Sequence, residues 1–224
     1  MVIPVSAPSR VRALLRSAPD GPVPVLHRGR DAVYVEIAGR CVGVVSRRAT
    51  AVPCALRTGT DALPDVRWAR IVTGVLHLDD ESLPIGRVVD VRVPTVRTLA
   101  TIPAPPPGDI AAMVGRGDGL TPYDDDVLCG WLAVHRAAGV ATDEVDAAVR
   151  HCLGRTTLLS ATLLDCAMHG EVIPEFARWL AAVGTDAEPD LAVRLATVGH
   201  TSGRGLLQGA RAALDHLSPE GVAA

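Results

Sequence analysis

The stretch Ile-Pro-Ala-Pro-Pro-Pro-Gly at residues 102–108 divides the 224-residue chain into two parts of different character. Successive prolines favour an extended, semi-rigid spacer, because each ring fixes its backbone φ and removes an N–H donor. Before this stretch apolar and polar residues alternate, whereas after it they recur with the period of a helix. We therefore predict a β domain over residues 1–101, a linker over 102–108 and a helical domain over 109–224.

The part before the prolines shows strand patterns after one short helical pattern at residues 8–17. Apolar residues alternate over 33–38, and a second strand pattern at 41–45 follows through a short glycine turn, which indicates a hairpin. Further strands are expected at 68–78 and 87–93. These patterns predict an α+β chain whose N-terminal domain is a small β-barrel or sandwich.

The part after the prolines contains six helical patterns, and a glycine suited to a C-terminal cap follows most of them. The expected helices span residues 122–138, 143–153, 157–169, 173–183, 189–198 and 203–217, and the glycines are Gly139, Gly154, Gly170, Gly184 and Gly199. Because the connections are short, neighbouring helices should pack antiparallel, so we predict a compact all-helical C-terminal domain.

The composition excludes several classes of function. A net charge of −3 and 3% aromatic residues argue against nucleic-acid binding. All 22 cationic residues are arginine, which excludes a Schiff-base lysine and a Walker-type phosphate lysine. The five cysteines show no CxxC pairing and are expected to be small buried residues of a reducing compartment. With no signal-peptide pattern and no apolar run of about 18 residues, we expect a cytoplasmic protein without a membrane partner.

A glycine-rich loop, Gly-Arg-Gly-Asp-Gly-Leu-Thr at residues 115–121, leads into three consecutive aspartates at 124–126. Glycines let backbone N–H groups approach a ligand closely, and the helix start that follows attracts anions. Carboxylate oxygens are the ligands that Mg²⁺ prefers beside phosphate. The predicted substrate-binding residues here are Gly117, Gly119 and Thr121, and the predicted catalytic residues are Asp125 and Asp126, which would coordinate Mg²⁺ or orient a nucleophile.

The same residues also suit a plain helix start. Thr121 can be an N-cap, Asp124 can complete a capping box, and the helix macrodipole favours acidic residues in a first turn. Capping alone needs neither Asp125 nor Asp126, and it needs none of the three glycines. The functional interpretation therefore rests on the aspartates and glycines that capping does not require. No cofactor other than Mg²⁺ is predicted.

Two further helix starts, at residues 154–157 and 199–203, also offer hydroxyl groups. The predicted substrate-binding residues there are Arg155, Thr156, Thr157, Thr201, Ser202 and Gly203, and His200 is a predicted catalytic acid or base. As alternatives, each start is a plain cap, and His200 caps the preceding helix or bonds a neighbouring carbonyl. If the three starts meet in space, they form a pocket for a carboxylate, phosphate or carbamoyl oxygen.

At these loops the sequence resembles a bacterial domain-of-unknown-function family that includes the third subunit of oxamate carbamoyltransferase. The family pattern Gly-x-Gly-x-Gly-Leu-Thr-Pro-x-Gly-Asp-Asp-x-Leu-x-Gly corresponds to residues 115–130, a Thr-x-x-Ser helix start to Thr157 and Ser160, and a Gly-His-Ser-Ser-Gly segment to residues 199–203. The resemblance covers most of the second part of the chain.

Two residues depart from the family pattern: Asp124 stands where the family has glycine, and Gly205 stands where it has aspartate. The resemblance implies a carbamoyl-type transferase, or a catalytic-complex subunit, that acts on a small anionic carboxylate or carbamoyl substrate together with other subunits. Two alternatives belong to other classes. One is a non-catalytic subunit that docks a larger carbamoyltransferase-type partner, and the other is a sensor domain that binds a metabolite.

Overall fold

The structure is a computed structural model that describes residues 2–98 and 100–217, so residues 1, 99 and 218–224 of the predicted domains lie outside the described part. The chain forms two compact units, residues 1–91 and 92–224. Each unit has its own core and is described by itself.

The proline-rich segment at residues 102–108, which we predict to be a linker, lies within the second unit. The Ala104 N–H donates to His135 Nε2 at 2.9 Å, and the Pro105 carbonyl accepts a hydrogen bond from Trp131 Nε1 at 3.1 Å. His135 Nδ1 lies 2.8 Å from the Trp131 carbonyl, so the buried imidazole is neutral and holds its proton on Nδ1. The boundary between the units therefore precedes this segment.

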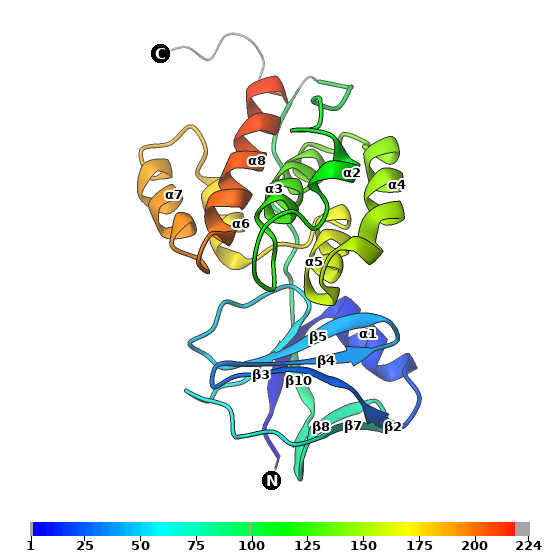
Figure 1. Ribbon diagram of the computed structural model, residues 1–224. Coiled ribbons are helices and arrows are strands. Elements are labelled where there is room, and N and C mark those ends of the chain that lie inside the picture. Colours follow the sequence, from blue (N-terminus) through cyan, green and yellow to red (C-terminus); the bar gives the residue numbers. More distant parts are fainter. Residues whose placement is uncertain (1, 99, 218–224) are drawn as a thin grey trace. The chain divides into compact units, whose positions relative to one another are not determined.

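The described residues of the first unit form ten strands and one helix (Figure 1). They are β1 (Val5–Pro8), α1 (Ser9–Ser17), β2 (Gly21–Val23), β3 (Val25–Arg28), β4 (Ala32–Ile37), β5 (Arg40–Val45), β6 (Ala55–Arg57), β7 (Ala69–Val72), β8 (Val75–Leu78), β9 (Glu81–Leu83) and β10 (Ile85–Val89). Strands such as β2, β6 and β9 have only three residues, which is too short for an alternating pattern to identify them in the sequence.

These strands form two sheets, with the orders β10-β1-β6-β5-β4-β3 and β2-β7-β8-β9. Both sheets contribute to one apolar core, which includes Val35, Leu56, Ile71 and Leu76. Because the edge strands β10 and β3 do not pair with each other, the described strands form open sheets and not a closed barrel. The predicted α+β class is confirmed, whereas the barrel is not.

Two hairpins show how turn residues with positive φ determine where one strand ends and the next begins. The predicted β4–β5 hairpin is confirmed, with Ala38 and Gly39 at φ 48° and 72° in the turn. The single strand predicted at 68–78 is instead the β7–β8 hairpin, which turns at Thr73 and Gly74 with φ 50° and 74°. Positive φ at both central residues matches the right-handed twist of paired strands. The Thr-Gly pair lies within an apolar run, so periodicity alone did not reveal the turn.

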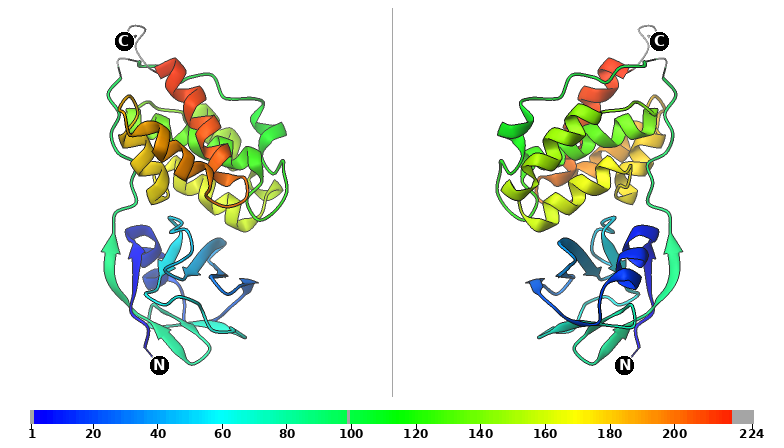
Figure 2. Two further views of the ribbon diagram at one scale, coloured as in Figure 1. Left: turned by 90° about the vertical axis from the view of Figure 1, so that its left-hand side faces the viewer. Right: turned by 90° about the vertical axis from the view of Figure 1, so that its right-hand side faces the viewer.

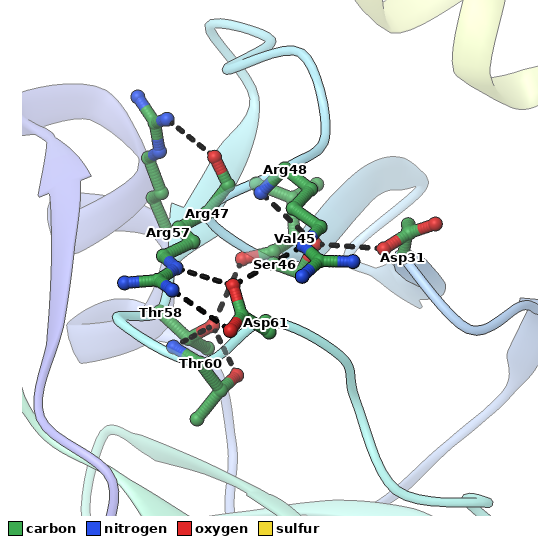
Figure 3. A network of polar contacts seen from close by, with 9 residues as sticks. All are labelled: Asp31, Val45, Ser46, Arg47, Arg48, Arg57, Thr58, Thr60 and Asp61. Carbon is green, nitrogen blue, oxygen red and sulfur yellow. Dashed lines mark hydrogen bonds and ion pairs between the residues drawn. The ribbon is translucent and has the colours of Figure 1, made fainter.

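The parallel strands β5 and β6 end at the same edge of their sheet, where a polar network closes the loop after each strand (Figure 3). The Arg47 guanidinium forms a bidentate ion pair with Asp61, and Arg48 Nε lies 3.2 Å from Oδ1 of the same carboxylate. Nearby, Ser46 Oγ donates to Asp31 Oδ1 at 3.0 Å. All of these ion-paired side chains are about half exposed, so the network is a solvated surface cluster.

The second unit is helical, as predicted (Figure 2). Its elements are α2 (Ile110–Met113), α3 (Tyr123–Ala138), α4 (Asp143–Cys152), the 3₁₀ turn η1 (Leu153–Arg155), α5 (Leu158–Met168), α6 (Pro174–Ala181), α7 (Glu188–Ala196) and α8 (Ser202–Leu217). All six predicted helices are present. Gly139, Gly170, Gly184 and Gly199 take positive φ after a helix, whereas Gly154 lies inside η1 without one.

Helices α3 and α8 cross at a distance that only glycine permits (Figure 1). A Cβ atom at Gly209 would lie 1.8 Å from the Val127 carbonyl oxygen, and one at Gly130 would lie 2.1 Å from the Leu206 carbonyl oxygen. Real Cβ atoms do not approach this closely, so a side chain here would push the helices apart. No helix among the described residues is long and apolar enough to cross a membrane.

Candidate functional site

The starts of α3, α5 and α8 meet at the glycine-rich loop, residues 115–121. Thr157 Oγ1 at the start of α5 donates to the Leu120 carbonyl, and the hydroxyls of Thr121 and Ser202 lie 2.9 Å apart. Thr157 also caps α5 by accepting a hydrogen bond from the Ser160 N–H at 3.0 Å. The loop is therefore tied to two other helix starts, and the spatial convergence on which the predicted site depends is present.

The three loop glycines differ in how much space surrounds the position that a Cβ atom would take. At Gly115 (φ 84°) a Cβ atom would lie 2.3 Å from the Arg155 carbonyl oxygen, and at Gly117 (φ 124°) it would lie 2.6 Å from the Tyr123 nitrogen. These two glycines allow backbone segments to pack closely. At Gly119 (φ 87°) no atom lies within 4 Å of the Cβ position, so the loop is open there. Residues 116–120 are exposed.

Asp125 fixes this arrangement, because donors from the loop and from α5 surround its carboxylate. The side chain is fully buried, with 0% exposure. Its Oδ1 accepts the Gly115 N–H at 2.8 Å, and its Oδ2 accepts the hydroxyls of Thr156 and Ser160, the latter at 2.6 Å. Three hydrogen bonds compensate the burial of this charge. Asp125 thus joins the loop to the start of α5.

Asp126, the next residue, has a different environment. It is 5% exposed, and its Oδ2 is buried without a hydrogen-bond partner. The pKa of Asp126 is raised to about 7, chiefly by burial; the nearby Ser202 hydroxyl lowers it, the Asp125 carboxylate raises it, and the Thr121 hydroxyl lowers it. Asp126 can therefore exchange a proton near neutral pH, and it retains an unused acceptor.

The two departures from the family pattern both lie beside these aspartates. Asp124 forms an ion pair with Arg116, so the loop's own arginine balances the charge that Asp124 adds. At Gly205 a Cβ atom would lie 2.8 Å from Asp126 Cβ and 3.0 Å from the Tyr123 carbonyl oxygen. An aspartate at residue 205 would not fit against this arrangement of α3.

The aspartates do not fit a shared Mg²⁺ site. Asp125 uses both carboxylate oxygens for donors, and Asp124 pairs with Arg116, which leaves Asp126 alone with a free oxygen. Protein-bound Mg²⁺ takes oxygen ligands in a near-octahedral arrangement. Within the described residues, no three His, Cys, Asp or Glu side chains form a group that could hold a metal ion. We derive no chemistry from a metal here.

The remaining predicted residues take other positions. His200 and Arg155 are exposed, and Arg155 Nη1 donates to the Ala111 carbonyl. The N–H of Gly203, a predicted substrate-binding residue, donates to the Val198 carbonyl at 3.0 Å. The Thr201 carbonyl accepts the N–H groups of Arg204 and Gly205. These donors of the first turn of α8 are therefore engaged within the protein, and Ser202 contributes through its hydroxyl.

Two residues of the site were not among the predicted site residues. Ser160 holds Asp125, and Gly205 leaves the space that Asp126 occupies. The Thr-x-x-Ser spacing was a signal for Ser160, because it placed a second hydroxyl on the first turn of α5. No sequence pattern pointed to the contact between Gly205 and Asp126, which depends on how α8 crosses α3.

No curated protein and no solved structure matches this chain. The match to a known family covers residues 113–214, which include the loop, the three helix starts and every predicted site residue. That family is described as oxamate carbamoyltransferase subunit AllH, so the comparison confirms the resemblance that the loop motifs indicate.

Proposed function

We propose that this chain is a subunit of an oxamate carbamoyltransferase-type complex and that it binds a small carboxylate or carbamoyl substrate beside Asp126. The family match supports the subunit role and, with it, other protein subunits as partners. One observation carries the binding site: Asp126 is buried with an unpartnered Oδ2, beside two hydroxyls, at the meeting point of three helix starts.

The surroundings of Asp126 suit an anionic ligand that also makes hydrogen bonds. Thr121 and Ser202 can each rotate a hydroxyl toward a ligand oxygen. The exposed N–H groups of Gly117 and Gly119 take part in no described backbone hydrogen bond, and the positive φ of these residues suits a concave, anion-binding backbone. Arg155 and His200 remain predicted partners for charge on the substrate.

A thermal-shift experiment on the full chain tests this proposal. Oxamate, carbamoyl phosphate and inorganic phosphate are added singly, with and without Mg²⁺. A ligand at about 100 times its dissociation constant adds roughly 2.7 kcal/mol to the free energy of unfolding, which is a clear rise in Tm. The Ser202→Ala variant should lose the rise, whereas Ser17→Ala, a serine at the end of α1 in the first unit, should keep it.

An unchanged Tm with all three probes would contradict a ligand site in the isolated chain. The non-catalytic alternative, a subunit that docks a larger partner, would then be favoured. A rise in Tm without chemical change of the ligand would favour the sensor alternative. If the rise in Tm requires Mg²⁺ and this requirement disappears in Asp126→Asn, the result would support a metal ion at Asp126. It would then contradict our conclusion from the hydrogen bonds of Asp125 that the aspartates do not hold a metal.

A further inference from the structure

The first unit contains a groove that has no part in the function proposed above. It lies on the smaller sheet, that of β2, β7, β8 and β9 (Figure 1). The groove has a volume of about 610 Å³ and is lined by residues 20–22, at β2, and residues 68–72, along β7. Both segments belong to the first unit, whereas the family match begins at residue 113. The family match therefore assigns nothing to this groove.

The groove lies on the face of the sheet that points away from the core. Along β7 the side chains of Ala69 and Ile71 are buried in the core, so Arg70 between them points to the opposite face. Its partners across the neighbouring strands are Pro22 on β2 and His77 on β8. Burial lowers the pKa of His77 and the charge of Arg70 lowers it further, so this imidazole is neutral at pH 7. Arg70 is therefore the charged member of this cross-strand row.

Trp68 and Arg70 give the groove an apolar surface and an unused positive charge. Trp68 is 38% exposed, whereas the other two tryptophans of the chain are buried. The Arg70 guanidinium lies 5.2 Å from the centre of the Trp68 ring, a cation–π distance, and among the described residues no hydrogen bond or ion pair engages it. Asp20, the acidic residue that lines the groove, instead accepts the Thr73 N–H at 2.7 Å. The groove thus presents a positive charge that the protein does not neutralise.

The length and polarity of the groove suit an extended peptide that carries a carboxylate. Residues 68–72 extend over roughly 13 Å, the length of about four residues of extended chain. Trp68 can pack against an apolar side chain, and Arg70 can form a bidentate ion pair with a carboxylate. Pro22 lies in the middle of the edge strand β2 and has no N–H to donate, which disfavours the addition of a further strand at this edge. Recognition should therefore come from side chains on the face of the sheet.

We propose that this groove is the docking site for an extended segment of a partner protein chain, in which a carboxylate pairs with Arg70 and a neighbouring apolar side chain packs on Trp68. Charge complementarity selects this occupant, because Arg70 has no counter-ion within the protein. Tryptophan and arginine are also the residue types enriched among the dominant contacts of protein interfaces. The inference rests on the proposed subunit role for the existence of a partner, and it does not depend on a ligand site beside Asp126.

The experiment measures how a capped, fluorescein-labelled peptide, Leu-Pro-Leu-Glu-Leu-Pro, binds the full chain by fluorescence anisotropy. Oxamate and carbamoyl phosphate are absent. Replacing the peptide's glutamate by glutamine should weaken binding about tenfold or more, because the charged pair with Arg70 is lost. Arg70→Gln should weaken binding of the original peptide by a similar factor and should bind both peptides equally.

Two further variants and a second measurement locate the peptide. Trp68→Ala should also weaken binding about tenfold or more. Arg87→Gln is the matched control, because this arginine is exposed on β10, an edge strand of the other sheet, and it should keep the wild-type affinity. A melting curve of each variant verifies folding. Because the other tryptophans are buried, acrylamide quenching reports chiefly on Trp68, and the unlabelled peptide should reduce the quenching.

The outcomes separate this inference from the proposed ligand site. If the peptide leaves the quenching unchanged, or if Arg70→Gln binds it as tightly as the wild-type chain, the docking role is wrong. If sedimentation shows a wild-type dimer that Trp68→Ala separates, the occupant is a second copy and the partner chain is wrong. Competition by glutarate at the same concentration as the peptide would overturn the peptide class. Peptide binding in a chain whose Tm no small anion raises would support the groove while the site beside Asp126 fails.

Discussion

Two groups of carboxylates, one in each unit, are held in opposite ways. In the first unit, Asp61 lies at the surface between Arg47 and Arg48, and its side chain is 45% exposed (Figure 3). In the second unit, Asp125 and Asp126 are 0% and 5% exposed. Solvent screens a surface ion pair, whereas a buried carboxylate must find donors or shift its pKa. The same residue type is therefore a minor surface feature in one unit and a structural or functional element in the other.

The contrast recurs between neighbouring residues of α3. Asp125 has three donors and holds the loop, whereas Asp126 has an unused oxygen and a raised pKa. Burial alone thus does not identify a functional carboxylate, because its hydrogen-bond partners decide whether it has capacity for a ligand. The predictions below test this comparison, from the largest expected effect to the smallest.

Asp125→Ala should be the most destabilising of these changes, by about 4 kcal/mol, because it removes a charged acceptor and leaves three donors unpaired near the core. Urea unfolding followed by circular dichroism measures the loss. Asp125→Asn should lose less, because a side-chain amide can still accept and donate at this position. A loss below about 1 kcal/mol for Asp125→Ala would show that the loop does not depend on this carboxylate.

Gly209→Ala should cost about 3 kcal/mol, because its Cβ would lie 1.8 Å from the Val127 carbonyl oxygen and would force α8 away from α3. Gly154→Ala is the matched control, since no atom lies within 4 Å of its Cβ position and its φ is not positive. The same unfolding experiment compares the two. Equal stability of both variants would contradict the close crossing of α3 and α8.

The pH dependence of stability should depend on Asp126. Its pKa is about 7 in the folded chain against an ordinary value of 3.8, so the folded state binds more protons between these values. Stability should therefore fall as pH rises from about 4 to about 7 and level off above that range.

The difference between the wild-type chain and Asp126→Asn isolates this contribution. His135 acts in the opposite sense, because burial lowers its pKa and its contribution is lost as pH falls below the unfolded value. Both proteins contain His135, so it cancels in the difference. A difference that stays flat between about pH 4 and about pH 7 would contradict the raised pKa of Asp126.

Asp61→Asn should have the smallest effect on stability. The pH dependence that Asp61 contributes should have the opposite direction to that of Asp126. Hydrogen bonding and charge from Arg47 lower the pKa of Asp61, so its contribution is present above the unfolded pKa and is lost as pH falls through the folded value. Because the pair is solvated, high salt should erase the difference in Tm between Asp61→Asn and the wild-type chain. A large, salt-independent loss of Tm would mean that the surface network of Asp61 stabilises the first unit as strongly as the buried hydrogen bonds of Asp125 stabilise the second.

The sequence was most informative where periodicity extended over many residues. The six helices α3 to α8 were predicted, because each has an apolar face and most are followed by a glycine cap, whereas the four-residue α2 was missed. Short strands such as β6 and the Thr73–Gly74 turn were missed, because three or four residues carry too little pattern. The loop motif indicated the candidate site region, and its hydroxyl and carboxylate residues do come together.

What the sequence by itself determined is the order of strand and helix patterns, the loop and the residue types that gather around it. Only the tertiary structure decided which aspartate is engaged and which retains an acceptor. The physical reason is that the hydrogen-bond partners of a side chain come from residues that are distant in sequence. Thr156 and Ser160 reach Asp125, whereas Ser202 and Gly205 surround Asp126 because glycines let α8 lie directly on α3.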